Sequence, residues 1–297
     1  MPAAGRLRLA TRGSPQALTQ AQHVAEAITA ATGLATELVP ISTTGDRDQS
    51  VPLHVIGGLG VFVKEIQQAV LDGRADVAVH SAKDLPSEAP AELVIGAFCA
   101  RRDAADALIG RALAELDDGA TVATGSVRRR AQLADERPDL KFVELRGNIA
   151  RRLEKVPAGG AIVMAVAALE VLGITDRIAE RLDPARFVPA VGQGCVAVEL
   201  RGDDRECADV LAAIDHGPSR FAVTVERAFL RELGAGCSLP VGAHCHGSDL
   251  DAFLAGDDER PNAAAPFRES VLLAADIDAA SASAVSLARR ARDAVGA

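Results

Sequence analysis

A cysteine in a glycine-rich turn is the residue of this chain with the clearest potential for covalent chemistry. Cys237 lies within residues 234–242, which read GAGCSLPVG. A thiol in so tight a turn either fills space in the packing or serves as a nucleophilic attachment point. Both interpretations stay open until the rest of the chain indicates what such a sulfur would face.

Arginine and serine side chains gather where expected strands pass into expected helices. Arg12 and Ser14 stand at the first such junction, and Ser126, Arg128 and Arg129 stand at a second. A helix N-terminus offers free backbone N–H groups and a favourable dipole to an anion. Each junction alone is equally compatible with a capped helix beside a solvated arginine. The three consecutive arginines at 128–130 cannot share one helix face, so we expect at least one of them to face solvent.

A third junction repeats this design. Arg146 ends an expected strand, Asn148 follows it, and Arg152 lies on the next expected helix. Guanidinium groups bind carboxylates through two parallel hydrogen bonds. Three such junctions in one chain therefore indicate a ligand that carries several carboxylates.

A lysine–aspartate pair follows another expected strand. Lys83 and Asp84 come shortly after His80 and Ser81. The pair is either a surface ion pair of little energetic value, or it places Asp84 in a cleft where a carboxylate handles a proton or stabilises a developing cation. We expect His80 to be a hydrogen-bonded core residue rather than a catalyst.

Two further patterns do not support a site. Cys237, His244, Cys245 and His246 lack the paired Cys-x-x-Cys spacing of a structural zinc site, so no metal is expected. The glycine-rich residues 57–60 are not followed by the Lys-Ser/Thr of a phosphate-binding loop. A hinge or lid is the more plausible role for that stretch.

The composition limits the class of protein. The chain has 297 residues, of which 48% are hydrophobic and 25% charged, as in ordinary globular proteins of two or three domains. A net charge of -9 argues against nonspecific binding to nucleic acid or anionic lipid. Eight Phe with no Trp or Tyr leave little for base stacking, so nucleic acid is not an expected partner.

The cellular location is inferred from apolar segments that the sequence lacks and from its cysteines. No window approaches 18 uninterrupted apolar residues, and the first residues lead into an expected strand without the apolar segment of a signal peptide. The five cysteines are odd in number and scattered, which suits a reducing compartment. We expect a cytoplasmic protein that does not cross a membrane.

Strands and helices alternate along most of the chain, which predicts an α/β protein built from parallel βαβ units. The expected strands are residues 6–11, 37–42, 76–80, 121–124, 141–145, 161–165, 195–200 and 271–277. The expected helices are residues 15–32, 61–71, 127–137, 149–155, 167–172, 220–233 and an alanine-rich C-terminal segment. Residues 257–266 are an expected exposed loop.

The alternation restarts once and changes character near residue 219. This predicts two α/β domains and a small α+β domain: residues 1–104 with 197–218, residues 105–196, and residues 219–297. Ligands of open α/β sheets bind at the carboxyl ends of the strands. The junctions described above stand at those positions.

Taken together, these patterns resemble the porphobilinogen deaminase family over essentially the whole chain. The matching stretches are residues 10–15 (ATRGSP), 60–65 (GVFVKE), 78–86 (AVHSAKDLP), 145–148 (LRGN), 189–194 (PAVGQG), 226–228 (ERA) and 236–237 (GC). Their order and spacing make a chance match very improbable.

The resemblance implies a fold and a cofactor. It implies three domains, the first two like periplasmic binding proteins with the active cleft between them, in a monomer. It also implies a dipyrromethane cofactor that the enzyme builds from its own substrate and that Cys237 holds by a thioether. The family's catalytic carboxylate matches Asp84.

The resemblance further assigns binding residues. Those expected to bind the cofactor are Ser81, Lys83, Ser126, Arg128, Arg129 and Arg146. Those expected to bind the substrate are Arg12, Ser14, Asn148 and Arg152.

The implied activity is that of a transferase, hydroxymethylbilane synthase, in tetrapyrrole (haem) biosynthesis. Four porphobilinogen molecules would be condensed with loss of ammonia, and hydrolysis would release a linear tetrapyrrole. Each unit adds an acetate and a propionate, which suits an arginine-lined cleft. The alternative is a non-catalytic protein of the same fold that binds an anion or a tetrapyrrole.

Two positions depart from the family pattern. Leu59 stands where a lysine is common in the glycine-rich stretch, and Val171 stands where an arginine is common in residues 168–173 (ALEVLG). The loss of both cations is expected to weaken carboxylate binding somewhere in the cleft. Arg130 or Arg177 could compensate.

Overall fold

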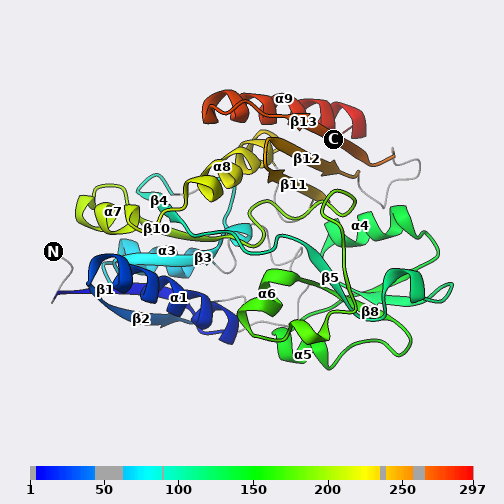
Figure 1. The fold of residues 1–297 in the computed structure, drawn as a ribbon, viewed down its shortest axis with the longest axis horizontal. Helices are drawn as coiled ribbons and strands as arrows, with labels where there is room; N and C mark the ends of the chain where they lie inside the picture. Colours follow the sequence, from blue (N-terminus) through cyan, green and yellow to red (C-terminus); the bar gives the residue numbers. More distant parts are fainter. Residues whose placement is uncertain (1–4, 44–62, 89, 235–238, 257–264, 297) are drawn as a thin grey trace.

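The structure is a computed structural model that describes residues 5–43, 63–88, 90–234, 239–256 and 265–296 (Figure 1). Two of the singled-out positions, Cys237 and Leu59, lie outside the described residues, as does most of the expected loop at 257–266. The α/β class with a small α+β unit is confirmed by three separate sheets.

The first unit is a five-stranded sheet in the order β2-β1-β3-β10-β4. Its strands are β1 (Arg6–Arg12), β2 (Ala35–Ile41), β3 (Val77–Ser81), β4 (Leu93–Phe98) and β10 (Val196–Arg201). Its helices are α1 (Pro15–Thr32), α3 (Lys64–Leu71) and α7 (Arg205–Ala212). β1 pairs in parallel with β2 and β3, whereas β10 runs antiparallel to β3 and β4.

The second unit repeats this plan with the order β7-β6-β8-β5-β9. Its strands are β5 (Asp106–Gly110), β6 (Thr121–Ala123), β7 (Lys141–Val143), β8 (Ala161–Ala165) and β9 (Glu180–Arg181). Its helices are α4 (Val127–Glu136), α5 (Ile149–Leu153) and α6 (Val166–Val171). Here β5 is the antiparallel partner of β8 and β9. The expectation of purely parallel units is therefore wrong for one strand in each unit, which makes two antiparallel pairings there.

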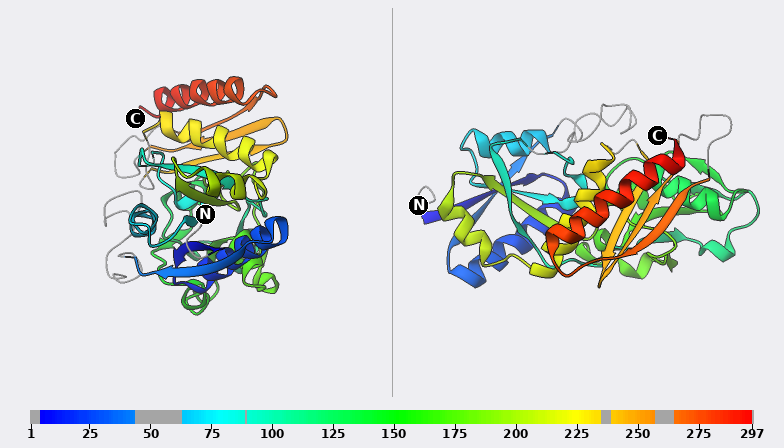
Figure 2. Two further views of the ribbon diagram at one scale, coloured as in Figure 1. Left: turned by 90° about the vertical axis from the view of Figure 1, so that its left-hand side faces the viewer. Right: turned by 90° about the horizontal axis from the view of Figure 1, so that it is seen from above.

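The third unit is a three-stranded antiparallel sheet covered on one face by two helices. It contains β11 (Val241–His246), β12 (Asp249–Leu254), β13 (Phe267–Leu272), α8 (Gly217–Glu232) and α9 (Ile277–Val295). Figure 2 shows α9 lying across this sheet. Alternate residues of β12, namely Leu250, Ala252 and Leu254, pack with α8 and α9. Phe253 points the other way and packs against Ala131 and Val188 of the second unit.

Local signals explain where the first long helix begins and ends. Ser14 caps α1 by accepting a hydrogen bond from the backbone N–H of Ala17, and Pro15 occupies the first helical position. Gly33 ends the helix in the left-handed conformation with φ 73°. The predicted boundaries of this helix are confirmed.

The expected strand at 271–277 is wrong at its end. The strand is β13, which stops at Leu272, and Ile277 is the first residue of α9. Asp276 caps that helix through a hydrogen bond from the backbone N–H of Ala279. A run of apolar residues across this boundary concealed the N-cap.

One buried carboxylate joins the third unit to both segments that connect the first two. The chain passes from the first unit to the second near Arg101 and returns near Gly192. Glu226 of α8 accepts from Arg101 Nη1 at 2.5 Å, from the Gly192 N–H at 2.7 Å and from the Cys245 N–H at 2.8 Å. Burial raises the pKa of Glu226, but Arg101 and His244 outweigh it and lower the pKa overall. The third unit therefore holds the two connections in place.

Candidate active site

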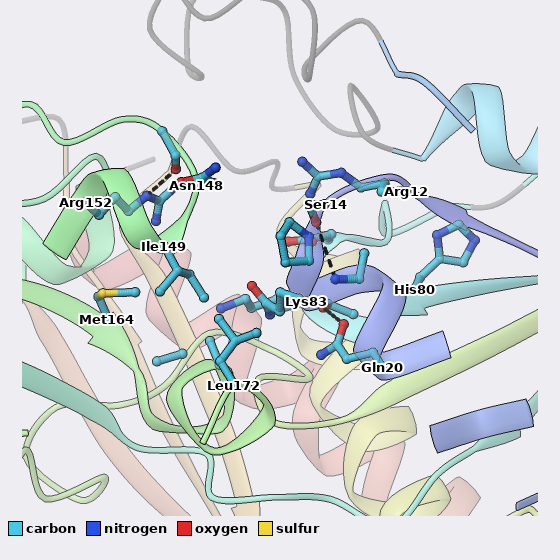
Figure 3. A pocket seen from close by; sticks show the side chains of 18 of the residues that line it. Arg12, Ser14, Gln20, His80, Lys83, Asn148, Ile149, Arg152, Met164 and Leu172 are labelled. Atoms are coloured by element: carbon cyan, nitrogen blue, oxygen red, sulfur yellow. Dashed lines mark hydrogen bonds between the residues drawn. The ribbon is translucent and has the colours of Figure 1, made fainter. Parts of the chain in front are cut away.

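A cavity of about 350 Å³ lies between the first two units and brings most of the predicted site residues together. The predicted residues that line it are Arg12, Ser14, Ser81, Lys83, Asp84, Arg129, Arg146, Asn148 and Arg152. Figure 3 shows Arg12 and Ser14 on one side, Asn148 and Arg152 on the other, and Lys83 between them. Residues more than a hundred positions apart in sequence thus share one site.

The first unit contributes the end of β1 and the start of α1. Arg12 is the last residue of β1, and Ser14 is the N-cap of α1. Gln16 and Ala17, in the first turn of α1, also line the cavity. The free N–H groups and the dipole of this 18-residue helix are directed at the site.

Opposite it, the second unit contributes the turn between β7 and α5. Gly147 adopts φ 115°, a conformation that favours glycine. Asn148 caps α5 by accepting from the backbone N–H of Arg151 at 3.0 Å, and Arg152 Nε donates to the Gly147 carbonyl at 2.7 Å. Nη1 of Arg146 is buried without a hydrogen-bond partner among the described residues. A buried guanidinium with an unsatisfied N–H is ready to bind an anionic oxygen.

The two arginines at the start of α4 have different surroundings. Arg129 lines the cavity, whereas Arg128 is 4% exposed and does not appear in the lining. Asp106 accepts from Arg128 Nη2 and from Arg129 Nη2, each at 2.7 Å. Burial raises the pKa of Asp106, but these two guanidinium groups outweigh it and hold the pKa well below its usual range. Arg130 is exposed, as expected for one of three consecutive arginines.

Ser126 is not among the residues that line the cavity either. It caps α4, accepting from the backbone N–H of Arg129 at 3.4 Å. Its role in the described structure is to start the helix that carries Arg128 and Arg129. The binding roles of Ser126 and Arg128 stay predictions.

The lysine–aspartate pair lies on the turn η2 (Ala82–Asp84), which follows β3. Both side chains are partly exposed and line the cavity, so the interpretation as a cleft pair fits better than that of a surface ion pair. Lys83 Nζ donates to Gln193 Oε1 at 3.2 Å. Ser81 Oγ donates to Gln20 Oε1 at 3.0 Å, which fixes the Gln20 amide at the cavity wall.

Positive charges repel one another in this cavity. Burial lowers the pKa of Lys83 to about 8, and Arg129 adds to the lowering. Burial also lowers the pKa of Arg152 to about 10, again with a contribution from Arg129, while Asp84 opposes both shifts. Among the described lining residues, five cations face one carboxylate, Asp84. A ligand with several carboxylates would relieve this repulsion.

An apolar wall completes the cavity, and sequence analysis did not identify it. Ile149, Met164 and Leu172 lie together on the side of the second unit (Figure 3). Val171, the last residue of α6, is 8% exposed and does not line the cavity, whereas its neighbour Leu172 does. The only sequence signal for this wall is an ordinary buried strand and helix, which does not distinguish a cavity wall from a core.

Other candidate groups lie at the margin or elsewhere. His80 is 5% exposed and lies at the edge of the cavity, so its expected core position is confirmed. Its Nε2 lies 3.0 Å from Glu199 Oε2 without the geometry of a hydrogen bond, so the expected hydrogen bond of this nitrogen is not found among the described residues. Within the described ranges, no three His, Cys, Asp or Glu side chains are arranged to hold a metal ion. No helix in the described part of the chain is long and apolar enough to cross a membrane.

Comparisons with known proteins agree with these observations. Residues 7–209 match the family model "Porphobilinogen deaminase, dipyromethane cofactor binding domain", and residues 220–262 match "Porphobilinogen deaminase, C-terminal domain". The porphobilinogen deaminase of Xanthomonas campestris pv. campestris (strain B100) is 48% identical over 256 residues, which are 84% of each chain. That of Nitratidesulfovibrio vulgaris (strain DSM 19637 / Miyazaki F) is 46% identical over 80% of this chain and 77% of its own.

Solved structures with a similar fold are more distant. The methionine binding protein MetQ is 16% identical with a TM-score of 0.45, covering 72% of this chain and 92% of its own. The VFT2 domain of Bordetella pertussis BvgS is 19% identical with a TM-score of 0.42, covering 71% of this chain and 87% of its own. Both values are too low to support an inference about the site.

Proposed function

This chain belongs to the porphobilinogen deaminase family, and on that premise we propose that the cavity between its first two units is the place where porphobilinogen is condensed. The activity is that of a transferase, hydroxymethylbilane synthase. It joins four porphobilinogen molecules, with loss of ammonia, into the linear tetrapyrrole hydroxymethylbilane. The observation that supports this cavity as the site of condensation is the group of five cations around Asp84.

The charge of the substrate fits this group. Porphobilinogen carries an acetate and a propionate, so each added unit brings two negative charges into the cavity. Arg12 and Arg152 offer guanidinium forks for these carboxylates, and Ser14 adds the N-terminus of α1. Asn148 holds the turn that presents Arg152. We assign these residues to substrate binding.

The residues present also fit the dipyrromethane cofactor. Nη1 of Arg146 is buried without a partner in the described structure, and the cations around Lys83 repel one another, so both favour a resident anion. Lys83, Arg129 and Arg146 would hold its carboxylates at the cavity wall. We assign Ser81, Ser126 and Arg128 to cofactor binding as well. When bound, the cofactor supplies the pyrrole carbon to which the first porphobilinogen is joined.

Asp84 is the proposed catalytic residue. When ammonia leaves the aminomethyl group of porphobilinogen, a cation delocalised over the pyrrole ring remains. The carboxylate of Asp84, placed among five cations, can stabilise that charge and accept a hydrogen bond from a pyrrole N–H. The apolar wall at Ile149, Met164 and Leu172 excludes water from one side of the reacting group.

Cys237 is the proposed point of covalent attachment. It lies outside the described residues, so its assignment rests on the family membership and the glycine-rich sequence around it. A thioether at this position would keep the growing chain attached while Asp84 and the arginines act on each new unit. The sulfur would then be a permanent anchor rather than a nucleophile in every cycle.

Three further proposals concern the whole protein. We place the domain boundaries at residues 1–104 with 197–218, 105–196 and 219–297, because each of the three sheets lies within one of these parts except for Val196, the first residue of β10. We propose a cytoplasmic monomer that binds neither nucleic acid nor membrane. The net charge of -9 and the scattered cysteines support this, and the four cysteines in the described ranges are free.

A turnover assay tests the function directly. Purified protein given porphobilinogen should release one ammonia per molecule consumed and form hydroxymethylbilane, which closes spontaneously to a porphyrinogen and can be oxidised and detected by absorbance. A protein that only binds tetrapyrroles would retain ligand and release no ammonia. That result would favour the non-catalytic alternative.

A further inference from the structure

The side-chain amide of Gln193 joins the two sides of the cavity. Its Nε2 donates to the Ala104 carbonyl at 2.7 Å and to Asp106 Oδ1 at 2.8 Å, and its Oε1 accepts from Lys83 Nζ at 3.2 Å. Lys83 belongs to the first unit, whereas Asp106 begins β5 of the second. One amide therefore contacts both the cavity lysine and the carboxylate that pairs with two arginines.

Chemistry fixes the orientation of this amide. A carbonyl and a carboxylate accept hydrogen bonds, while an ammonium can only donate them. The amide nitrogen must therefore face Asp106 and Ala104, which leaves the amide oxygen for Lys83. A flipped amide would set N–H groups against the ammonium and an oxygen against the carboxylate.

The backbone around Gln193 is held equally firmly. Gly192 and Gly194 adopt φ 71° and φ 86°, and a Cβ at Gly194 would lie 2.6 Å from a backbone oxygen. The Gln193 carbonyl accepts from Arg101 Nε at 2.8 Å, and the Gly192 N–H donates to Glu226 at 2.7 Å. Gln193 itself is 1% exposed. With the backbone held in this way, a rotation of the side chain would break the hydrogen bonds of its amide.

We propose that Gln193 is a positioning residue that holds the Lys83 ammonium at the cavity wall and couples it, through Asp106, to the arginine pair of the second unit. The proposal rests on the proposed function in one respect, the use of Lys83 to bind carboxylates. The coupling itself stands on the contacts of the side chains. It follows that a change at Gln193 alters the protonation of Lys83, although the two residues are 110 positions apart.

The expected direction of that change follows from the hydrogen bond. Lys83 has a pKa lowered to about 8 by burial and by Arg129, so its charged form is only moderately favoured near neutral pH. The Gln193 oxygen accepts from the charged form and stabilises it. Removing this acceptor lowers the pKa of Lys83 further, by about half a unit or more.

Direct titration of Lys83 tests the coupling. The chain contains four lysines, Lys64, Lys83, Lys141 and Lys155, so protein labelled with ¹³C at lysine Cε gives few signals in an NMR titration. The loss of one signal in the Lys83→Arg variant assigns it. The full-length protein is titrated as purified, so any group bound in the cavity contributes to wild type and variant alike.

Two variants and one control are compared with the wild type. Gln193→Leu removes the amide, and Gln193→Asn shortens it by one methylene so that it cannot span Asp106 and Lys83. Both are expected to lower the Lys83 pKa by about half a unit or more. Gln132→Leu is the matched control. The Gln132 side chain is also 1% exposed, but its amide hydrogen-bonds the backbone N–H and carbonyl of Val188. This variant should leave the Lys83 titration unchanged.

The outcomes separate this proposal from the proposed function. If Gln193→Leu does not fold, the Gln193→Asn variant decides. An unchanged Lys83 pKa in the folded Gln193 variants overturns the coupling, and so does an equal shift in Gln132→Leu. Absence of turnover in the wild type would contradict the function while leaving the titration readable. Where turnover is present, the alkaline fall of kcat/KM should move to lower pH in both Gln193 variants.

Discussion

Asp106 and Arg129 form a buried ion pair in which Oδ1 accepts from Nη2 at 2.7 Å and from Nε at 3.0 Å. The second carboxylate oxygen accepts from Arg128 Nη2, also at 2.7 Å. This pairing fixes Arg129 at the cavity wall and holds Arg128 behind it. The Asp106 carboxylate thus holds the neighbouring residues Arg128 and Arg129 in different positions relative to the site.

Asp106→Asn should destabilise the fold, because it leaves two guanidinium groups without their counter-charge in the interior. Breaking one partner of a buried pair costs about 3–5 kcal/mol of unfolding free energy. Urea denaturation measures this loss. Asp139→Asn, which removes a surface partner of Arg137, should change the midpoint little. Equal midpoints for the Asp106 variant and the wild type would contradict the account of the pair.

The same pair predicts how stability depends on acid. The folded-state pKa of Asp106 lies below its ordinary value, so its contribution is fully present above the unfolded pKa of about 4 and is lost as the pH falls. The Asp106→Asn variant has no such contribution to lose. Its denaturation midpoint should therefore fall less steeply than that of the wild type on acidification.

Asp84→Asn should abolish most turnover while the fold survives. The amide keeps the shape of the carboxylate but cannot stabilise a cation by charge, so kcat should fall at least about a hundredfold. Circular dichroism and the thermal midpoint check that the protein is folded. Glu88→Gln neutralises an exposed carboxylate near the same loop and should keep full activity. Normal turnover in Asp84→Asn would exclude it as the catalytic residue.

Arg152→Leu should weaken substrate binding, because its guanidinium group lines the cavity and can donate to a substrate carboxylate. Losing a charge-assisted hydrogen bond costs about 1.5–3 kcal/mol, so KM should rise about tenfold to a hundredfold. Steady-state kinetics measure the change. Arg151→Leu is the matched control, since Arg151 is exposed on the same helix, outside the cavity lining. Equal KM values in the two variants would argue against the assignment.

Lys83 predicts an alkaline limb in the pH profile. Its pKa is lowered to about 8 by burial and Arg129, and only the charged amine attracts carboxylates, so kcat/KM should fall as the pH rises through that value. Carboxylates of a bound cofactor raise the pKa and move the limb to somewhat higher pH. Lys83→Arg keeps its charge throughout this range and should lose the limb. An unchanged limb in that variant would assign it to another group.

Local signals in the sequence sufficed for the elements that carry the site. Ser14 and Gly33 mark the ends of α1, and β8 has its predicted bounds, because caps and apolar runs are short-range features. The three junctions meet in one cavity because they follow strands of facing units. The sequence predicts β10 but not its antiparallel direction, since strand direction depends on connections that local patterns do not encode. It does not predict β5 (Asp106–Gly110) as a strand at all.

The rest of the site depends on long-range partners. The sequence does not reveal that Arg128 pairs with Asp106, 22 positions away. Gln193 stands in a recognisable motif, yet its contacts with Lys83 and Asp106 exist only in the folded chain. The apolar wall around Met164 and Leu172 has the same sequence pattern as the core. Such features require tertiary structure to be identified.

The intact mass of the purified protein tests the central claim most directly. The account predicts a mass that exceeds the sequence mass by two linked pyrrole units, and a loss of this excess in Cys237→Ala. Cys245→Ala, which changes a free, buried cysteine of β11, should retain it. A wild-type protein that turns over porphobilinogen at its bare sequence mass, or an excess that survives in Cys237→Ala, would contradict Cys237 as the anchor of the cofactor.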